Sequence, residues 1–315
     1  AAHVERCRVA RLDPGNDGLF GDDRIPGLQI DAAHTAGHRS GDDVHVAYPR
    51  LTFIGDADHH GTALDLDEND SDAAPTRNRD IATYGARIRR SPKASAFDFE
   101  LEYARQTGSV RGSTNPADIA DLDHEADMLH AEAGNTFAAA WSPRLSLHYD
   151  YASGDDSPSD LSSERFDPLF GDRSFEFGPT SIWGAIFRSN LKSPGVRIEL
   201  KPDKTNELMG MVRQVKLESA ADSFGSSGVR DATGASGEDV GAHIELRWRH
   251  QLVPDGVRLS IGGAALLRDD FLKSAPNATG LGDSITVTMS PSGAILVNGL
   301  FTVVEIRNFD TRDQL

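Results

Sequence analysis

Short stretches in which apolar and polar residues alternate recur along the chain, each ending at a turn or a loop. The clearest pair is 240–250 and 257–268, which the turn sequence VPDG joins. In the first, Leu246 and Trp248 share one face, and Arg247 lies on the other. A period of two residues is that of a β-strand with two different faces. The two stretches therefore predict a β-hairpin.

The same alternation predicts further strands upstream, at 81–90, 97–104, 127–141, 145–151 and 196–201. Two more stretches, 44–54 and 208–218, have the composition of strands but no clear assignment of faces. We therefore predict an all-β, antiparallel protein in which this chain supplies about ten or eleven strands.

The connections between these strands alternate between short and long. The short ones are SPKA (91–94), SPR (142–144), PDKTNE (202–207) and LVPDG (252–256). The long polar ones lie near 55–80, 106–126, 153–190 and 219–239. A soluble β-sandwich has no reason to sort its connections in this way, whereas an outer-membrane barrel has short periplasmic turns and long extracellular loops. The pattern predicts an antiparallel transmembrane β-barrel of the outer-membrane porin type.

Charge and composition narrow the function classes. The formal net charge of −17 argues against a nucleic-acid-binding protein. No stretch reaches the ~18–20 apolar residues of a transmembrane helix. Basic and acidic residues roughly balance in the clear strands, and the acidic excess lies in the long connections, notably 55–72, which we predict to be solvated and mobile. A single cysteine, Cys7, excludes an intrachain disulfide.

A longer motif points to a family. Residues 150–180 read DYASGDDSPSDLSSERFDPLFGDRSFEFGPT. This segment resembles the alginate export family of outer-membrane porins, in which a YDYASGD strand end leads into a loop with ERFDPLFG. The resemblance covers roughly residues 12–283, because several further segments match in the same order. They are LTFIGDADHHG (51–61), FDFELEYARQTG (97–108), SNLKSPGVRIELKP (189–202), LESAADSF (217–224) and RDDFLKSAPNATG (268–280).

The resemblance implies a monomeric barrel of about eighteen strands in the outer membrane of a Gram-negative cell. It also implies a positively charged lumen that passes a polyuronate. Expected partners are an anionic polysaccharide or a small anionic solute, outer-membrane lipid and lipopolysaccharide, and periplasmic export proteins. No enzyme activity, cofactor, metal or nucleic acid is expected.

The C-terminal sequence departs from the family. After Gly282-Asp283 the family has an aromatic-rich last strand that ends in Phe, but here the chain runs SITVTMSPSGAILVNGLFTVVEIRNFDTRDQL. We expect residues 1–283 to form barrel strands with long acidic loops and short turns. Residues 284–315 are expected to be an atypical β-prone tail. The chain is therefore interpreted as a fragment, or as aberrant at its C-terminus, with an incomplete barrel.

A ladder of basic residues is the main candidate site for solute passage. Its members, all on the predicted lumen side, are Arg87, Arg89, Arg197, Lys201, Arg247, Arg249 and Arg258. Guanidinium groups bind carboxylates, and rings of such charges make a pore selective for anions. The alternative is that these residues pair with acidic neighbours and only stiffen the wall. The sequence leaves both open.

The ERFDPLFG segment is a second candidate because it is too apolar for a free loop. One hypothesis places it over the pore mouth as a constriction, with Arg165, Asp167 and Arg173 near the solute. The alternative, which we favour, is a hydrophobic latch between extracellular loops.

Two motifs that suggest other chemistry fail on inspection. Ser146, His148 and Asp150 share a strand face, but alternate strand residues lie ~6.5–7 Å apart, which disfavours a hydrogen-bonded series, and no G-x-S-x-G is present. Asp65 and Asp67 begin like a calcium loop, but its required Gly and closing Glu are absent.

We therefore predict an outer-membrane channel for export or diffusion of an anionic polysaccharide such as alginate. The alternatives are a porin for small anionic solutes and a soluble secreted β-protein that binds carbohydrate or calcium. A barrel enzyme that uses Ser146 and His148 is a third. Dependence on detergent separates the membrane proteins from the soluble one.

Overall fold

One antiparallel β-sheet contains nearly all the regular structure in the computed structural model. The structure describes residues 30–33, 46–51, 58–67, 76–169, 186–252, 257–278 and 298–306, apart from 116, 158 and 226. Within these residues, no helix has both the length and the apolar character needed to cross a membrane. The predicted all-β, antiparallel class is confirmed.

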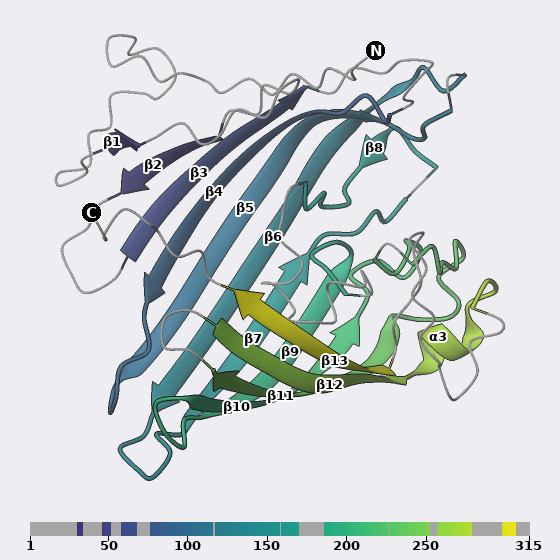
Figure 1. The fold of residues 1–315 in the computed structure, drawn as a ribbon. Helices are drawn as coiled ribbons and strands as arrows, with labels where there is room; N and C mark the ends of the chain where they lie inside the picture. Colours follow the sequence, from purple (N-terminus) through teal and green to yellow (C-terminus); the bar gives the residue numbers. More distant parts are fainter. Residues whose placement is uncertain are drawn as a thin grey trace.

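Twelve strands follow one another in the sheet in sequence order (Figure 1). They are β1 (Ile30–Ala33), β2 (Val46–Leu51), β3 (Asp58–Asp67), β4 (Asp80–Arg90), β5 (Phe97–Arg111), β6 (Asp121–Thr136), β7 (Arg144–Ala152), β9 (Leu191–Leu200), β10 (Asn206–Lys216), β11 (Asp239–Gln251), β12 (Val257–Arg268) and β13 (Asn298–Ile306). A two-residue strand, β8 (Ser162–Ser163), pairs in parallel with β6. The short helix α3 (Asp270–Ser274) follows β12. Part of the tail beyond residue 283 thus extends the sheet as β13.

The predicted loop at 55–72 is wrong, because β3 occupies its middle. β3 pairs with β4 along its whole length, from Asp58 opposite Arg89 to Asp67 opposite Asp80. With β3 included, short and long connections still alternate. The short ones are 52–57, 91–96, 137–143, 201–205 and 252–256, and the long ones are 68–79, 112–120, 153–190 and 217–238.

The two faces of the sheet are inverted relative to those of a soluble protein. Large apolar side chains are exposed on one face, which we call the apolar face: Tyr84, Leu101, Leu147, Val212 and Leu246. Charged and polar side chains are buried on the other, the polar face: Asp98, His148, Asp150, Arg213 and Glu245. Leu246 is 64% exposed, whereas its neighbour Glu245 is 2% exposed. A sheet with one face in water does the opposite.

The polar face is concave. Arg87 of β4 and Arg213 of β10 line one hollow of about 400 Å³, although five strand spacings separate them. In a flat sheet, at ~4.8 Å per spacing, they would lie about 24 Å apart. The sheet therefore curls around its polar face, as its curvature in Figure 1 shows.

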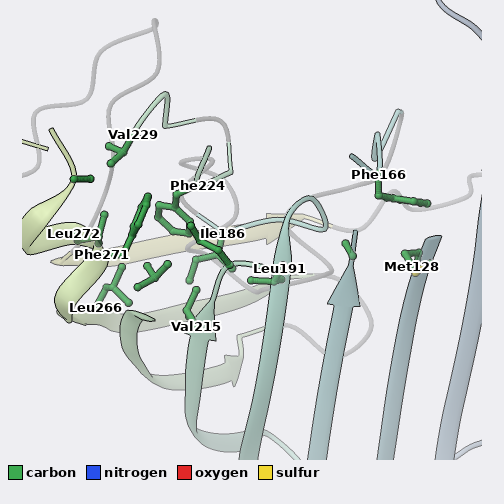
Figure 2. Close-up of a cluster of buried hydrophobic side chains, with 14 of the residues drawn as sticks. Met128, Phe166, Ile186, Leu191, Val215, Phe224, Val229, Leu266, Phe271 and Leu272 are labelled. Carbon is green, nitrogen blue, oxygen red and sulfur yellow. The ribbon is translucent and has the colours of Figure 1, made fainter. Parts of the chain in front are cut away.

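The apolar core lies at the end of the sheet that carries the long connections. Figure 2 shows Phe224, Ile186, Phe271 and Leu272 gathered above the strands, with Phe166 and Met128 of the same cluster farther to one side. Helix α3 contributes Phe271 and Leu272, which are almost fully buried, and the Asp269 side chain accepts the Asp270 N–H at its start. The described parts of the long connections thus fold over this end of the sheet.

Candidate functional site on the polar face

The hollow of the polar face is lined by charged and histidine side chains from six strands and one long connection. They are Arg87, Arg89, Glu100, Glu102, His130, Glu132, His148, Asp150, Arg188, Arg197 and Arg213. Strand alternation explains the set, because each residue has the parity that points to the polar face of its strand. The sequence predicted Arg87, Arg89 and Arg197 for this position.

Two arginines of β4 pair with one carboxylate of β5. Arg87 Nη2 lies 2.5 Å from Glu100 Oε1, and Arg89 Nε lies 3.5 Å from Glu100 Oε2. In register, Arg87 faces Glu102 and Arg89 faces Glu100. Both contacts are cross-strand ion pairs of the kind that stiffens a wall, and contact of these two arginines with a solute stays a prediction.

Arg144, at the start of β7, pairs with three carboxylates of the polar face. Its guanidinium contacts the carboxylate of Asp98, lies 2.5 Å from Glu132 Oε1 and lies 2.8 Å from Glu199 Oε2. The arginine is 8% exposed. Three carboxylates on three strands, β5, β6 and β9, thus share one buried cation.

A second network surrounds Asp150 of β7. Its Oδ1 lies 2.7 Å from His130 Nδ1, and its Oδ2 lies 3.3 Å from Arg213 Nη1. Arg188, from the long connection 153–190, lies 3.8 Å from Asp150 and 3.6 Å from Glu102. Arg188 thus ties the end of that connection to the wall of the hollow.

Ser146 and His148 do form a hydrogen bond, contrary to the expectation from strand spacing. Ser146 Oγ lies 2.8 Å from His148 Nε2, because the imidazole reaches back along its own strand. Glu132 Oε2 of β6, and not Asp150, lies 3.5 Å from His148 Nδ1. Ser146 is only 1% exposed, and Arg144 Nη1 lies 3.4 Å from its Oγ. The trio is packed within the polar face, with Ser146 and His148 both almost fully buried.

Arg197 of β9 and Arg247 of β11 differ from the other described arginines of the ladder. In the part of the chain that the structure describes, no carboxylate oxygen lies within 4.0 Å of either guanidinium. Both are half-buried, and the Nε atom of each lacks a hydrogen-bond partner there. Methionines separate them: Met211 faces Arg197 across β9 and β10, and Met209 faces Arg247 across β10 and β11. Arg197 Nη2 lies 3.6 Å from Met211 Sδ.

The remaining members of the ladder lie toward the short-connection rim. Arg249 faces Glu207, whose carboxylate lies 3.8 Å away. Lys201 lies beyond the end of β9, where its side chain is 65% exposed and 4.0 Å from Glu207, so it belongs to the rim and not to the wall. Arg258 faces Gln251 across β11 and β12.

The described part of the ERFDPLFG segment, residues 164–169, contacts both other connections and the sheet. Arg165 lies 2.9 Å from Asp222 and 2.7 Å from Ser189 Oγ, and it donates to the carbonyl of Gly225. Asp167 pairs with Arg79 at 2.8 Å. These contacts are ion pairs and hydrogen bonds, and the hydrophobic latch stays a prediction. Arg173 lies outside the described residues, and a role of the segment as a constriction stays a prediction.

The same segment is fixed to β5 by a buried glutamine. Gln106 Oε1 accepts the Asp167 N–H at 2.9 Å, and Gln106 Nε2 donates to the Asp167 carbonyl at 2.7 Å.

At the base of the same connection, burial together with the neighbouring carboxylate of Asp222 raises the pKa of Asp155.

Sequence reasoning missed Arg144, Arg188 and Arg213. Arg144 stood in the predicted turn 142–144, and Arg188 in a long connection. Arg213 stood in a stretch with apolar residues on both faces, because Met209, Met211 and Val215 share its polar face. Pairing 208–218 with the clear strand 240–250 would have revealed it, because Arg213 faces His243.

Comparison with known proteins identifies a family. A family model described as alginate export matches residues 37–281, more than three-quarters of the chain. The matched segment contains strands β2 to β12, and with them every residue that lines the hollow. No curated protein matches the chain.

Proposed function

The chain belongs to the alginate export family, and from this premise we propose that its sheet is part of an outer-membrane channel. The family is one of export, so a polysaccharide is the expected cargo. An anionic polysaccharide would pass along the concave polar face. The apolar face would stand against lipid.

The inverted faces are the observation that carries this proposal. Soluble proteins rarely expose wide apolar patches, yet apolar side chains of β4, β5, β7, β9, β10 and β11 are exposed on one side of this sheet. A membrane strand alternates an apolar lipid-facing residue with a polar lumen-facing one. The alternative of a soluble carbohydrate-binding or calcium-binding β-protein leaves this face unexplained.

Within the channel, we assign anion recognition to Arg197 and Arg247. The described cations and carboxylates of the polar face roughly balance, so its net charge does not select anions. Selectivity for anions then depends on cations that form no ion pair with a carboxylate of the protein. A guanidinium presents a fork of N–H donors that matches a carboxylate, and in these two arginines the fork has no carboxylate partner among the described residues.

Conductance in planar bilayers tests the proposal. The reconstituted protein should pass small anions in preference to cations, and an added polyuronate should block its current. Changing Arg197 and Arg247 together to Ala should weaken the block at least tenfold. The matched control is Arg105→Ala, because Arg105 lies on the apolar side of β5 and pairs with Glu125. A cation preference in the unaltered protein, or a block unchanged in the double variant, would contradict the assignment.

A further inference from the structure

The connection between β6 and β7, residues 137–143, is an apolar turn on the rim of the sheet. It reads FAAAWSP, and every residue from Phe137 to Trp141 is exposed. The turn lies at the end of the sheet opposite the long connections and the apolar core (Figure 1). An unbroken run of exposed apolar residues is unfavourable in a turn unless it has a function. Such a patch marks a surface that another molecule covers.

The backbone of this turn is held in one shape. The Ser142 N–H donates to the Ala139 carbonyl at 3.0 Å, and the Trp141 carbonyl accepts the Lys201 N–H at 2.7 Å. The second bond ties the turn to the neighbouring connection 201–205. Trp141 and Ser142 have φ angles of 67° and 43°, in the left-handed region that is costly for residues other than Gly. The turn therefore presents the Trp141 side chain from a fixed backbone.

The turn continues the apolar face of the sheet. One row across four strands consists of Phe97, Asn135, Leu145 and Ile198, which lie opposite one another in register. Its three apolar members are 52%, 46% and 45% exposed. Phe137 follows Asn135 by two residues, so it belongs to the same face, ~7 Å farther along the strand direction. Aromatic side chains at the border of an apolar band are typical of the boundary between lipid and water.

Exposed lysines flank the turn in the connections on both sides of it. They are Lys93 in residues 91–96, and Lys201 and Lys204 in residues 201–205. Two acidic residues lie near them. Asp203 accepts hydrogen bonds within its own turn, and Glu207 lies 4.0 Å from Lys201. Aromatic rings beside lysines are complementary to a leaflet with anionic headgroups above apolar chains.

We propose that the connection 137–143 is a membrane anchor, with Phe137 and Trp141 in the headgroup region of a phospholipid leaflet and the flanking lysines on its anionic phosphates. The inference rests on the proposed function and adds a lipid-binding surface on the short-connection rim. An indole combines an apolar ring with an N–H donor, so it is stable at this boundary. Within the described chain the Trp141 indole makes no hydrogen bond, whereas that of Trp248 donates to Asn206 at 2.9 Å. A lipid headgroup supplies an acceptor for Trp141.

Quenching of tryptophan fluorescence by brominated phospholipid tests the anchor in vesicles that contain the full chain. The sequence has three tryptophans. Trp183→Phe with Trp248→Phe leaves Trp141, and Trp183→Phe with Trp141→Phe leaves Trp248 as the reporter of the apolar face. Bromines near the headgroup should quench Trp141 about twofold more strongly than bromines near the chain ends, because an anchoring indole stays at the interface.

The two reporters separate the anchor from the proposed function. Quenching of Trp248 without quenching of Trp141 would overturn the anchor alone, as expected if water or a protein covers the turn. Quenching of Trp141 alone would support the anchor and refute lipid contact of the apolar face. Quenching of neither would refute both.

Lipid preference tests the lysines. In vesicles of equal parts phosphatidylcholine and phosphatidylglycerol, bromines on the phosphatidylglycerol should quench Trp141 more than bromines on the phosphatidylcholine. The anionic lipid should be enriched about fivefold around Trp141 at low salt, the factor that one lysine contributes near an anionic surface. Lys201→Ala with Lys204→Ala should remove most of this enrichment. The matched control is Lys216→Ala, at the opposite end of β10, which should remove none. Equal quenching by both lipids, or an enrichment that survives the double variant, would contradict the role of the lysines.

Discussion

Arg144 and Arg197 lie on adjacent strands of the polar face and differ in the carboxylates around them. Arg144 contacts Asp98, Glu132 and Glu199, whereas Arg197 has no carboxylate within 4.0 Å among the described residues. Removing the cation from a buried ion-pair network leaves uncompensated buried charge. Removing a cation that has no carboxylate partner leaves no such uncompensated charge.

Arg144→Ala should therefore lower the free energy of unfolding by about 3–5 kcal/mol. Arg197→Ala should change it by about 1 kcal/mol or less. Urea unfolding in lipid vesicles, followed by tryptophan fluorescence, measures both. Equal losses in the two variants would show that Arg197 is as structural as Arg144.

Asp203, in the connection 201–205, gives a prediction about pH. Its carboxylate accepts from Thr205 Oγ1 at 2.7 Å and from Asn206 Nδ2 at 2.8 Å, and these bonds lower its pKa to about 2. A lowered pKa stabilises the folded turn above the ordinary value near 4, and this contribution is lost as the pH falls through about 2. The Thr205 and Asn206 amides should thus stay protected at pH 3.5 and exchange faster near pH 2, as nuclear magnetic resonance can measure. Faster exchange already at pH 3.5 would contradict this account.

At the scale of elements, the segment 162–169 depends on Gln106. The amide of Gln106 satisfies both the N–H and the carbonyl of Asp167, and a buried group left unsatisfied costs about 1–3 kcal/mol. Gln106→Leu should therefore speed hydrogen exchange at the Asp167 amide at least tenfold. Thr107→Val, one residue away on the opposite face, is the control and should leave the exchange unchanged. An unaltered rate in Gln106→Leu would mean that Phe166 packing alone holds the segment.

Strands differ in how far the sequence predicted them. In β11, the alternation of Glu245, Leu246, Arg247 and Trp248 is regular, so both its existence and its faces followed from the sequence. β3 was missed because Leu64 and Leu66 lie on the polar face, where Leu66 is fully buried, and Asp65 lies on the other. Tertiary packing reversed the usual pattern there. The Arg188 contacts could not be predicted either, because they depend on where a long connection returns to the sheet.

At the scale of the whole molecule, the account depends on one sheet with opposite environments on its two faces. Membership in the alginate export family agrees with that arrangement, and the concave polar face supplies the hollow. Consecutive residues of a strand point to opposite faces. Two neighbouring residues on one strand therefore test the two environments, and a second strand repeats the test.

The most direct test is spin-label accessibility in lipid vesicles at Val196, Arg197, Leu246 and Arg247, each changed to cysteine in the Cys7→Ser background. Labels at 196 and 246 should be relaxed by oxygen, which concentrates in lipid. Labels at 197 and 247 should be relaxed by a water-soluble nickel complex. This alternation on two strands is the predicted result. Relaxation by the nickel complex at all four positions would contradict the claim that the apolar face stands against lipid.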